Sequence, residues 1–198
     1  MAARKIIVSN RLPVKVKEDN GVLEYQSSEG GLATGLGCIY NTGENIWVGW
    51  PGAEISETQK SRLTRDFADK HLQPIFLTAG EIQDYYEGFS NETLWPLYHY
   101  FPSYSIYNCT QWETYKAVNQ KFADAVLNIV REGDTVWVHD YQLTLVPAMI
   151  REKMPQCSIG FFQHIPFPSF EVFRALPWKE ELVNGLLGAD VIGFHTGT

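Results

Sequence analysis

Short apolar runs alternate with amphipathic segments along most of this chain. Continuous apolar runs are typical of parallel strands, which are buried on both faces of their sheet. We predict six strands, at residues 5–9, 46–49, 73–77, 135–139, 158–163 and 191–194. The alternation of strands with helical patterns predicts an α/β fold, with a mostly parallel sheet and right-handed connections.

The clearest helical pattern covers residues 111–131, where apolar residues recur at spacings of three and four. Gly133 and Asp134 are expected to end this helix and to begin the next strand. Residues 143–153 and 177–187 predict two further crossover helices. At 198 residues the chain has the length of one domain with a substantial core.

Three of the predicted strands lead into polar side chains. These are Asn10 and Arg11 after the first strand, His139 and Asp140 at the end of the fourth, and Gln163 and His164 at the end of the fifth. Because the interior of a parallel sheet is apolar, chemistry is presented at the carboxyl ends of its strands. A guanidinium, a carboxylate and two imidazoles at these ends predict one cleft for a polyhydroxylated, anionic ligand.

The overall charge narrows the classes of partner. A formal net charge of -7 and a pI near 5.2 give no general attraction to nucleic acid or to an anionic membrane surface. A bound phosphate must therefore be held by local cations such as Arg11. Cys38, Cys109 and Cys157 are widely spaced and have no histidine at metal-ligand spacing, so we expect a reducing compartment and no metal site.

Targeting signals are not evident in the sequence. The apolar run that follows Lys5 is too short for a signal-peptide core, and no later stretch approaches the length of a membrane span. We therefore expect a cytoplasmic protein with no membrane partner, and we leave a homo-oligomer open.

Each polar strand end has a structural alternative to a functional role. Arg11 could hold a phosphate with paired hydrogen bonds, or it could close its loop with a salt bridge. Asp140 could accept hydrogen bonds from sugar hydroxyls, act as a general base if its pKa were raised, or cap the helix that begins near Leu143. His164 precedes two prolines that force a stiff extended turn, which favours a functional orientation of its ring over a structural one.

Gly30 and Gly31 precede a helical pattern and could seat a diphosphate at a helix N-terminus, although a simple tight turn explains them as well. The spacing of the later glycines does not complete the nucleotide-binding pattern. A nicotinamide-dependent oxidoreductase is disfavoured for this reason.

Aromatic residues crowd the segment 81–102, and most of them are expected to cover the core. Tyr86 and Trp95 are also candidates for a sugar site, because sugars bind to aromatic faces. His71, His99 and His195 lack a comparable context, and we expect them to be structural or to lie on the surface.

Six motifs occur in a fixed order over nearly the whole chain, and together they are highly specific. They are SNRLP (9–13), GGLA (30–33), WVGW (47–50), YY (85–86) with FSN (89–91) and LWP (94–96), HDY (139–141) and HIPFP (164–168). The ordered set resembles the amino-terminal half of the trehalose-6-phosphate synthase family. Its members are retaining glycosyltransferases of the GT-B fold, with two Rossmann-like domains, which transfer glucose from UDP-glucose to glucose 6-phosphate without a metal or other cofactor.

The resemblance implies a role for each matching residue. On the acceptor side, Arg11 and Tyr86 would bind the phosphate and Asp140 would bind the sugar hydroxyls. Trp95 and Trp50 would line the acceptor pocket. On the donor side, Gly30 and Gly31 would contact the donor, and His164 would contact the transferred glucose. In this family no carboxylate attacks the anomeric carbon. Asp140 and His164 are therefore catalytic candidates that position the substrates, and a donor phosphate receives the proton.

The resemblance also implies that residues 1–198 form a truncated acceptor-side domain. The family's basic pair that clamps the donor diphosphate belongs to the second half of its chain and has no counterpart here. Gly197 and Thr198 depart from the usual continuation. We expect the isolated chain to be inactive alone. The alternative function is a non-catalytic sugar-phosphate-binding regulatory subunit. A complete donor domain in the natural protein would support the enzyme, and its absence would support the regulatory subunit.

Overall fold

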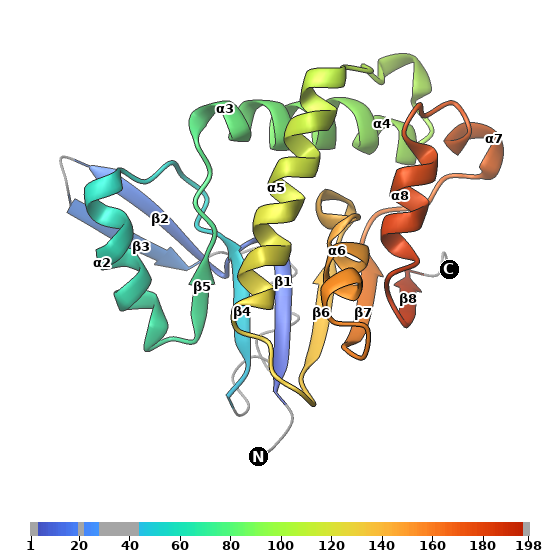
Figure 1. The fold of residues 1–198 in the computed structure, drawn as a ribbon. Helices are drawn as coiled ribbons and strands as arrows, with labels where there is room; N and C mark the ends of the chain where they lie inside the picture. Colours follow the sequence, from blue (N-terminus) through green and yellow to red (C-terminus); the bar gives the residue numbers. More distant parts are fainter. Residues whose placement is uncertain (1–3, 20–21, 28–43, 196–198) are drawn as a thin grey trace.

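The structure is a computed structural model that describes residues 4–19, 22–27 and 44–195. One sheet has six strands, and every neighbouring pair in it is parallel. Its strands are β1 (Lys5–Arg11), β4 (Ile46–Trp50), β5 (Leu72–Pro74), β6 (Thr135–His139), β7 (Ser158–Gln163) and β8 (Val191–Phe194). The predicted α/β fold with a parallel sheet flanked by helices is confirmed (Figure 1).

The order of the strands across the sheet is β5-β4-β1-β6-β7-β8. The chain therefore builds outward from β1 on one side and then returns to build outward on the other, so the direction reverses between β1 and β6. In open parallel sheets, ligands bind in the crevice at the carboxyl ends of the strands that flank such a reversal. Val8 of β1 pairs with Val48 of β4 and with Val138 of β6, which brings the ends of these three strands together.

Three helices cover one face of the sheet (Figure 1). They are α5 (Cys109–Leu127), α6 (Val146–Lys153) and α8 (Lys179–Leu186). Helix α5 begins before the predicted residue 111 because the side chain of Asn108 accepts hydrogen bonds from the amides of Thr110 and Gln111. The segment predicted as one helix over 143–153 is divided into a short turn, η3 (Tyr141–Leu143), and α6.

Other elements were not predicted. They are the antiparallel hairpin of β2 (Val14–Asp19) and β3 (Val22–Ser27), the helices α2 (Glu57–Ala68), α3 (Ala79–Glu81), α4 (Trp95–Tyr98) and α7 (Phe170–Phe173), the π-helix η1 (Ile82–Leu94) and the short helical turn η2 (Pro102–Tyr104). The strand predicted over 73–77 is wrong in its second half. Strand β5 lies at the sheet edge and ends at Pro74, which has no amide to donate.

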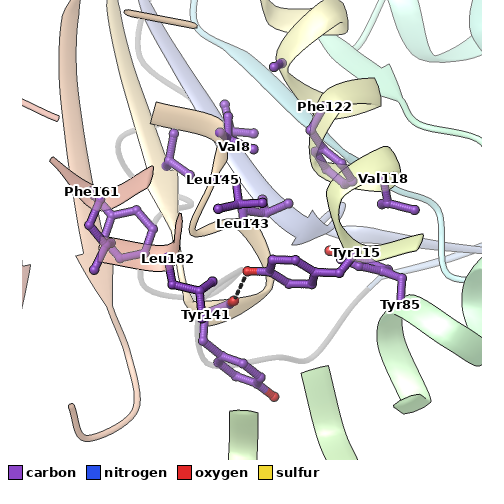
Figure 2. Packing of buried hydrophobic residues seen from close by; sticks show 14 of the residues in the cluster. Val8, Tyr85, Tyr115, Val118, Phe122, Tyr141, Leu143, Leu145, Phe161 and Leu182 are labelled. Atoms are coloured by element: carbon purple, nitrogen blue, oxygen red, sulfur yellow. Dashed lines mark hydrogen bonds between the residues drawn. The ribbon is translucent and has the colours of Figure 1, made fainter. Parts of the chain in front are cut away.

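The two faces of β1 contribute to two cores. Ile6 and Val8 point to the face that α5 covers, where Phe122 and the other buried residues pack (Figure 2). Ile7 points to the opposite face and belongs to the cluster of Trp47 and of α2. Because Ile6, Ile7 and Val8 are fully buried, the polar residues of this strand lie at its two ends: Lys5 is exposed at the amino end, and Ser9, Asn10 and Arg11 follow at the carboxyl end.

The aromatic segment crosses above the carboxyl ends of the strands as η1 and α4 (Figure 1). The amide of Trp95 bonds to the carbonyl of Ser90, five residues earlier, so this segment is a wide π-type helix. Tyr85, Phe89 and Tyr98 are buried in the main core, as the core-covering interpretation predicts.

Within the described residues, no helix is both long and apolar enough to cross a membrane. Of the two cysteines in these ranges, Cys109 is exposed and Cys157 is buried, and neither forms a disulfide. Cys38 lies outside the described residues.

Gly49 permits a close approach of β4 to the end of β1. A Cβ atom at this position would lie 2.9 Å from the carbonyl carbon of Arg11 and 2.9 Å from the amide nitrogen of Leu12. The pairing of β1 with β4 shifts its register between Val8 and Arg11, at this point of contact. The absence of a side chain at Gly49 thus sets where Arg11 leaves the sheet.

We predict that Gly49→Ala destabilises the fold by about 1–3 kcal/mol, because a methyl group there forces the two backbones apart. Denaturant unfolding of the variant measures this loss. Gly80→Ala is the control, because an added Cβ at Gly80 meets only Thr78 Oγ1, at 4.0 Å, in an exposed helical turn. Equal unfolding midpoints for Gly49→Ala and the wild-type chain would contradict the prediction.

Candidate functional site

The end of β1 presents the Arg11 guanidinium against two aromatic rings that also contact each other. Its central carbon lies 4.4 Å from the ring centroid of Trp50 and 5.2 Å from that of Tyr86. Trp50 is the last residue of β4, and Tyr86 comes from η1 above the sheet. The two rings are 5.8 Å apart. The structure therefore brings together three of the predicted site residues, Arg11, Trp50 and Tyr86.

The turn at Gly52 leaves the space that the Arg11 guanidinium occupies. Gly52 has a φ of +91°, and a Cβ atom there would lie 2.8 Å from Nη1 of Arg11. A glycine is required at this turn both for the positive φ and for the space that Arg11 fills. The indole nitrogen of Trp50 donates to the carbonyl of Ala53 at 3.0 Å, which fixes the ring below the guanidinium.

Within the parts of the chain that the structure describes, no carboxylate lies within 4.0 Å of Arg11. The loop-closing salt bridge, which is the structural alternative for this residue, is thus not formed there. Aromatic faces attract the cation but leave its in-plane N–H donors available. Arg11 is arranged to bind a planar pair of anionic oxygens.

Asp140 follows β6 in a strained backbone conformation, with φ 74° and ψ 166°. This region is almost restricted to glycine, and a residue with a side chain in it costs about 1–3 kcal/mol. Such strain persists where surrounding contacts impose it and is concentrated at functional sites. The position next to the reversal between β1 and β6 therefore has a backbone geometry typical of a site.

The carboxylate of Asp140 accepts two backbone hydrogen bonds through Oδ1. The donors are the amides of Tyr141 at 3.1 Å and of His164 at 3.2 Å. Asp140 thereby caps η3, as its structural alternative proposed, and also links β6 to the residue that follows β7. Burial raises the pKa of Asp140, although these amides and the nearby imidazole of His164 act in the opposite direction.

His164 lies beside Asp140 and contacts His139, the last residue of β6. Nδ1 of His139 is 3.0 Å from Nε2 of His164, and the two rings stack with centroids 5.3 Å apart. The ring of His195, which we expected to be structural or on the surface, lies 5.6 Å from that of His164. Burial lowers the pKa of His164, the charge of Asp140 raises it, and His195 lowers it, with a net lowering.

A network of buried tyrosines holds these strand ends in place. Tyr85 donates to Oδ1 of Asn10 at 2.9 Å, next to Arg11. Tyr115 of α5 donates to the carbonyl of Tyr141 at 2.7 Å, next to Asp140, as the dashed line in Figure 2 shows. The hydroxyl of Tyr141 donates to Oδ1 of Asn91 in η1. Helix α5 and η1 are thus joined by hydrogen bonds to the end of β1 and to the turn after β6.

Trp95 lies apart from the Arg11 cluster, although it belongs to the same crossing segment. Its side chain is 43% exposed and packs on the ring of His99, 4.1 Å away. It also lines a cavity of about 430 Å³ with Asn91, Glu92, Pro96, Phe101, Tyr104 and Ile106. Within the described residues, no hydrogen bond or ring contact joins Trp95 to Asp140 or to Arg11, so its place in an acceptor pocket stays a prediction.

Gly30 and Gly31 lie outside the described residues. Within the ranges that are described, no three His, Cys, Asp or Glu side chains gather so that they could hold a metal ion. Asn10 and His139, which the sequence placed at the polar strand ends, lie beside Arg11 and His164. The structure adds Tyr85 to the site, through its hydrogen bond to Asn10.

Comparisons with known proteins show the family of this chain. Residues 3–198 match the sequence profile of glycosyltransferase family 20. A trehalose-6-phosphate synthase from Mycobacterium avium is 48% identical over 193 residues, which are 96% of this chain and 39% of the relative. The chain thus spans about two fifths of the length of the curated relatives that it matches.

Solved structures share the fold at identities above 30%. One is an α,α-trehalose-phosphate synthase from Burkholderia xenovorans in complex with glucose-6-phosphate, with a TM-score of 0.79 and 33% identity over 98% of this chain and 41% of that one. Another, from E. coli, is bound with UDP-2-fluoro glucose, with a TM-score of 0.80 and 31% identity over 98% of this chain and 40% of that one.

The family profile covers almost the whole sequence, and the same chain builds the six-stranded parallel sheet with Arg11 and Asp140 at its point of reversal. On this evidence the chain belongs to glycosyltransferase family 20.

Proposed function

We propose that this chain is the acceptor-side part of a trehalose-6-phosphate synthase, which transfers glucose from UDP-glucose to glucose 6-phosphate with retention of configuration. The observation that carries the proposal is the Arg11 guanidinium, which packs against the rings of Trp50 and Tyr86 and has no carboxylate partner among the described residues. The similarity to trehalose-6-phosphate synthases supports the proposed reaction, and the related crystal structure with bound glucose-6-phosphate supports the proposed acceptor.

Arg11 suits the phosphate of the acceptor. Paired N–H donors match two phosphate oxygens, and such charge-assisted hydrogen bonds are stronger than neutral ones. The chain as a whole is anionic, with a formal net charge of -7. The Arg11 guanidinium at the end of β1 therefore provides a local attraction for a phosphate in a chain that is anionic overall. Tyr86 places its hydroxyl-bearing ring beside this cation and is proposed as a second phosphate ligand.

Asp140 and Trp95 are proposed to hold the sugar of the acceptor. The two amides that hold Oδ1 of Asp140 fix the direction of its carboxylate at the end of β6. Carboxylate oxygens accept hydrogen bonds from sugar hydroxyls, and aromatic rings pack against the apolar faces of sugars. Trp50 is proposed to line the same pocket.

In the proposed reaction the acceptor oxygen enters on the face from which the diphosphate leaves. The bond from the anomeric carbon to the diphosphate breaks as the bond to the acceptor oxygen forms, and a donor phosphate oxygen takes the proton of the acceptor hydroxyl. Asp140 would then orient the acceptor and not attack the anomeric carbon as the nucleophile of a retaining hydrolase does. His164 would contact the transferred glucose, and Gly30 and Gly31 the donor diphosphate.

We propose that residues 1–198 contain mainly the acceptor half of the site. The chain spans 39% of the length of the Mycobacterium avium relative, so most of that protein has no counterpart in it. Charge that develops on a leaving diphosphate needs a preorganised cationic environment. We expect that environment to belong to the second domain, so the isolated chain should turn over little or no substrate.

Separate calorimetric titrations with glucose 6-phosphate and UDP-glucose test this assignment. We expect saturable binding of glucose 6-phosphate and little or no binding of UDP-glucose by the isolated chain. Unphosphorylated glucose is the control, because without the phosphate it lacks the group that Arg11 is proposed to bind. Binding of UDP-glucose without glucose 6-phosphate would refute the assignment of the acceptor half-site.

Replacement of Arg11 tests the phosphate contact directly. Arg11→Lys keeps the charge but loses the planar pair of donors, and we expect the affinity for glucose 6-phosphate to fall about tenfold, or about 1.4 kcal/mol. Arg11→Ala should lose more, about ten- to a hundredfold, from the 1.5–3 kcal/mol of hydrogen bonds to a charged group. The exposed Arg65→Lys on α2 is the matched control. An unchanged affinity in Arg11→Ala would exclude the contact.

Asp140→Asn separates binding from stability. The amide keeps an acceptor at Oδ1, and asparagine tolerates a positive φ better than most residues. We expect affinity for glucose 6-phosphate to fall about tenfold, while the free energy of unfolding at pH 7 stays equal to or above that of the wild-type chain. Because the pKa of Asp140 is raised in the fold, its ionised form is a cost at neutral pH.

That cost disappears as the pH falls below the pKa of Asp140 in the unfolded chain. The stability advantage of Asp140→Asn should therefore shrink on acidification. Denaturant unfolding at pH 7 and at pH 4, together with the titration, measures both effects. A variant that binds as tightly as the wild-type chain would show that Asp140 acts only as the cap of η3.

A further inference from the structure

His139 has no role in the reaction as described so far, yet it is a buried imidazole beside the site. It ends β6 and is only 1% exposed. Its ring packs between Trp137, at 4.6 Å, and His164, at 5.3 Å. Nδ1 of His139 lies 3.0 Å from Nε2 of His164, whereas its own Nε2 is buried and has no hydrogen-bond partner among the described residues.

A single proton joins the two rings, because a hydrogen bond between neutral imidazoles needs one donor and one acceptor. If His164 were the donor, the proton of neutral His139 would have to be on Nε2. That choice buries an N–H group with no acceptor, which is rarer and more costly than an unpaired acceptor. The proton of His139 therefore lies on Nδ1, and Nε2 of His164 accepts it.

This assignment determines the state of His164. With Nε2 occupied as an acceptor, neutral His164 must carry its own proton on Nδ1. Within the described ranges, Nδ1 of His164 makes no hydrogen bond and is not a buried unpaired atom. The ring is half-buried beside Asp140, so this N–H group is free to donate to an oxygen of a ligand.

Protonation of either ring is opposed by its surroundings. Burial, and then the charge of His164, lower the pKa of His139 to about 3. The titratable groups that face His164 are His139, Asp140 and His195. Asp140 favours the imidazolium, but burial and His195 oppose it, and the net effect lowers the pKa of His164. A proton added to Nε2 of His164 would also point at the N–H of His139.

We propose that His139 is a positioning residue that holds His164 as the neutral Nδ1–H tautomer, so that His164 donates a hydrogen bond to an oxygen of the sugar nucleotide. The part of this statement that concerns the ligand rests on the proposed function. The tautomer itself rests only on the contact between the two rings and on the unpaired, buried Nε2 of His139.

Histidine NMR of the 198-residue chain tests the tautomer without any ligand. Two-bond ¹H–¹⁵N correlation spectra of the ¹⁵N-histidine-labelled chain distinguish Nδ1–H, Nε2–H and imidazolium forms, and the spectrum of His164→Gln assigns the signals of His164. We expect one Nδ1–H form of His164 in the wild-type chain at pH 7. An Nε2–H form or an imidazolium there overturns the proposal.

Two substitutions of His139 provide the matched pair. In His139→Asn the amide nitrogen occupies the place of Nδ1 and keeps the donor, so His164 should keep its Nδ1–H form. His139→Leu has no donor, and His164 should no longer show a single Nδ1–H form. An unchanged tautomer in His139→Leu overturns the proposal. If His139→Leu does not fold, the wild-type and His139→Asn spectra still decide, because loss of the Nδ1–H form in His139→Asn also contradicts it.

Acid stability gives an independent readout. The unfolded chain protonates His139 at its ordinary pKa near 6.5, whereas the folded chain does so only at about 3, so this residue makes stability fall as the pH drops through that window. His139→Asn should lose less stability than the wild-type chain between pH 6.5 and pH 4 in denaturant unfolding. Equal losses contradict a buried, neutral His139.

Binding of glucose 6-phosphate distinguishes failure of the proposed function from failure of the role of His139. Failure of glucose 6-phosphate to bind would reject the proposed function but would leave the spectra of His164 unaffected. Conversely, an Nε2–H form of His164 combined with normal binding of glucose 6-phosphate would reject the role of His139 alone.

Discussion

The position of β1 between β4 and β6 is the constraint on which the rest of the structure depends. All three strands are parallel and are covered on both faces, so Ile6, Ile7 and Val8 are fully buried and the sheet has no interior place for a charge. Polar groups are accommodated where the strands end, and the reversal of chain direction between β1 and β6 opens the space there. The close contact at Gly49 then sets the exit of Arg11, and the turn after β6 sets that of Asp140.

Arg11 and Asp140, at these strand ends, keep their conformations because the surrounding structure is rigid. Arg11 has aromatic rings but no carboxylate partner among the described residues, and Asp140 has a strained backbone and a raised pKa. Each state is unfavourable for the protein by itself and favourable for a ligand that supplies the missing partner. The hydrogen bonds of Tyr85 to Asn10 and of Tyr115 to the carbonyl of Tyr141 fasten the neighbouring backbone, which stabilises the arrangement before any ligand binds.

Charged and neutral groups at the strand ends differ in what they contribute to ligand recognition. A chain with a formal net charge of -7 repels anions over most of its surface, so a phosphate must be recognised at one place and by geometry. Arg11 gives the attraction and the direction, whereas the imidazoles of His139 and His164 stay neutral and contribute direction without charge. A neutral N–H donor beside the ionised Asp140 avoids an ion pair within the site, and both groups are left to meet hydroxyl and phosphate oxygens.

The sequence by itself determined the elements with a strong local signal and the residues that follow them. Five of the six sheet strands match their predicted positions closely, and so does the placement of Arg11, Asp140 and His164 at strand ends, because hydrophobic periodicity is a local property. The β2–β3 hairpin and the π-type η1 escaped prediction, the first because its alternating pattern was not recognised and the second because its bonding departs from the usual helical period. Only the tertiary structure decided that His139 contacts His164, 25 residues away, and that Trp95 packs on His99 away from Arg11. Such contacts depend on strand order and on the register of pairing, which bring together residues that share no local pattern.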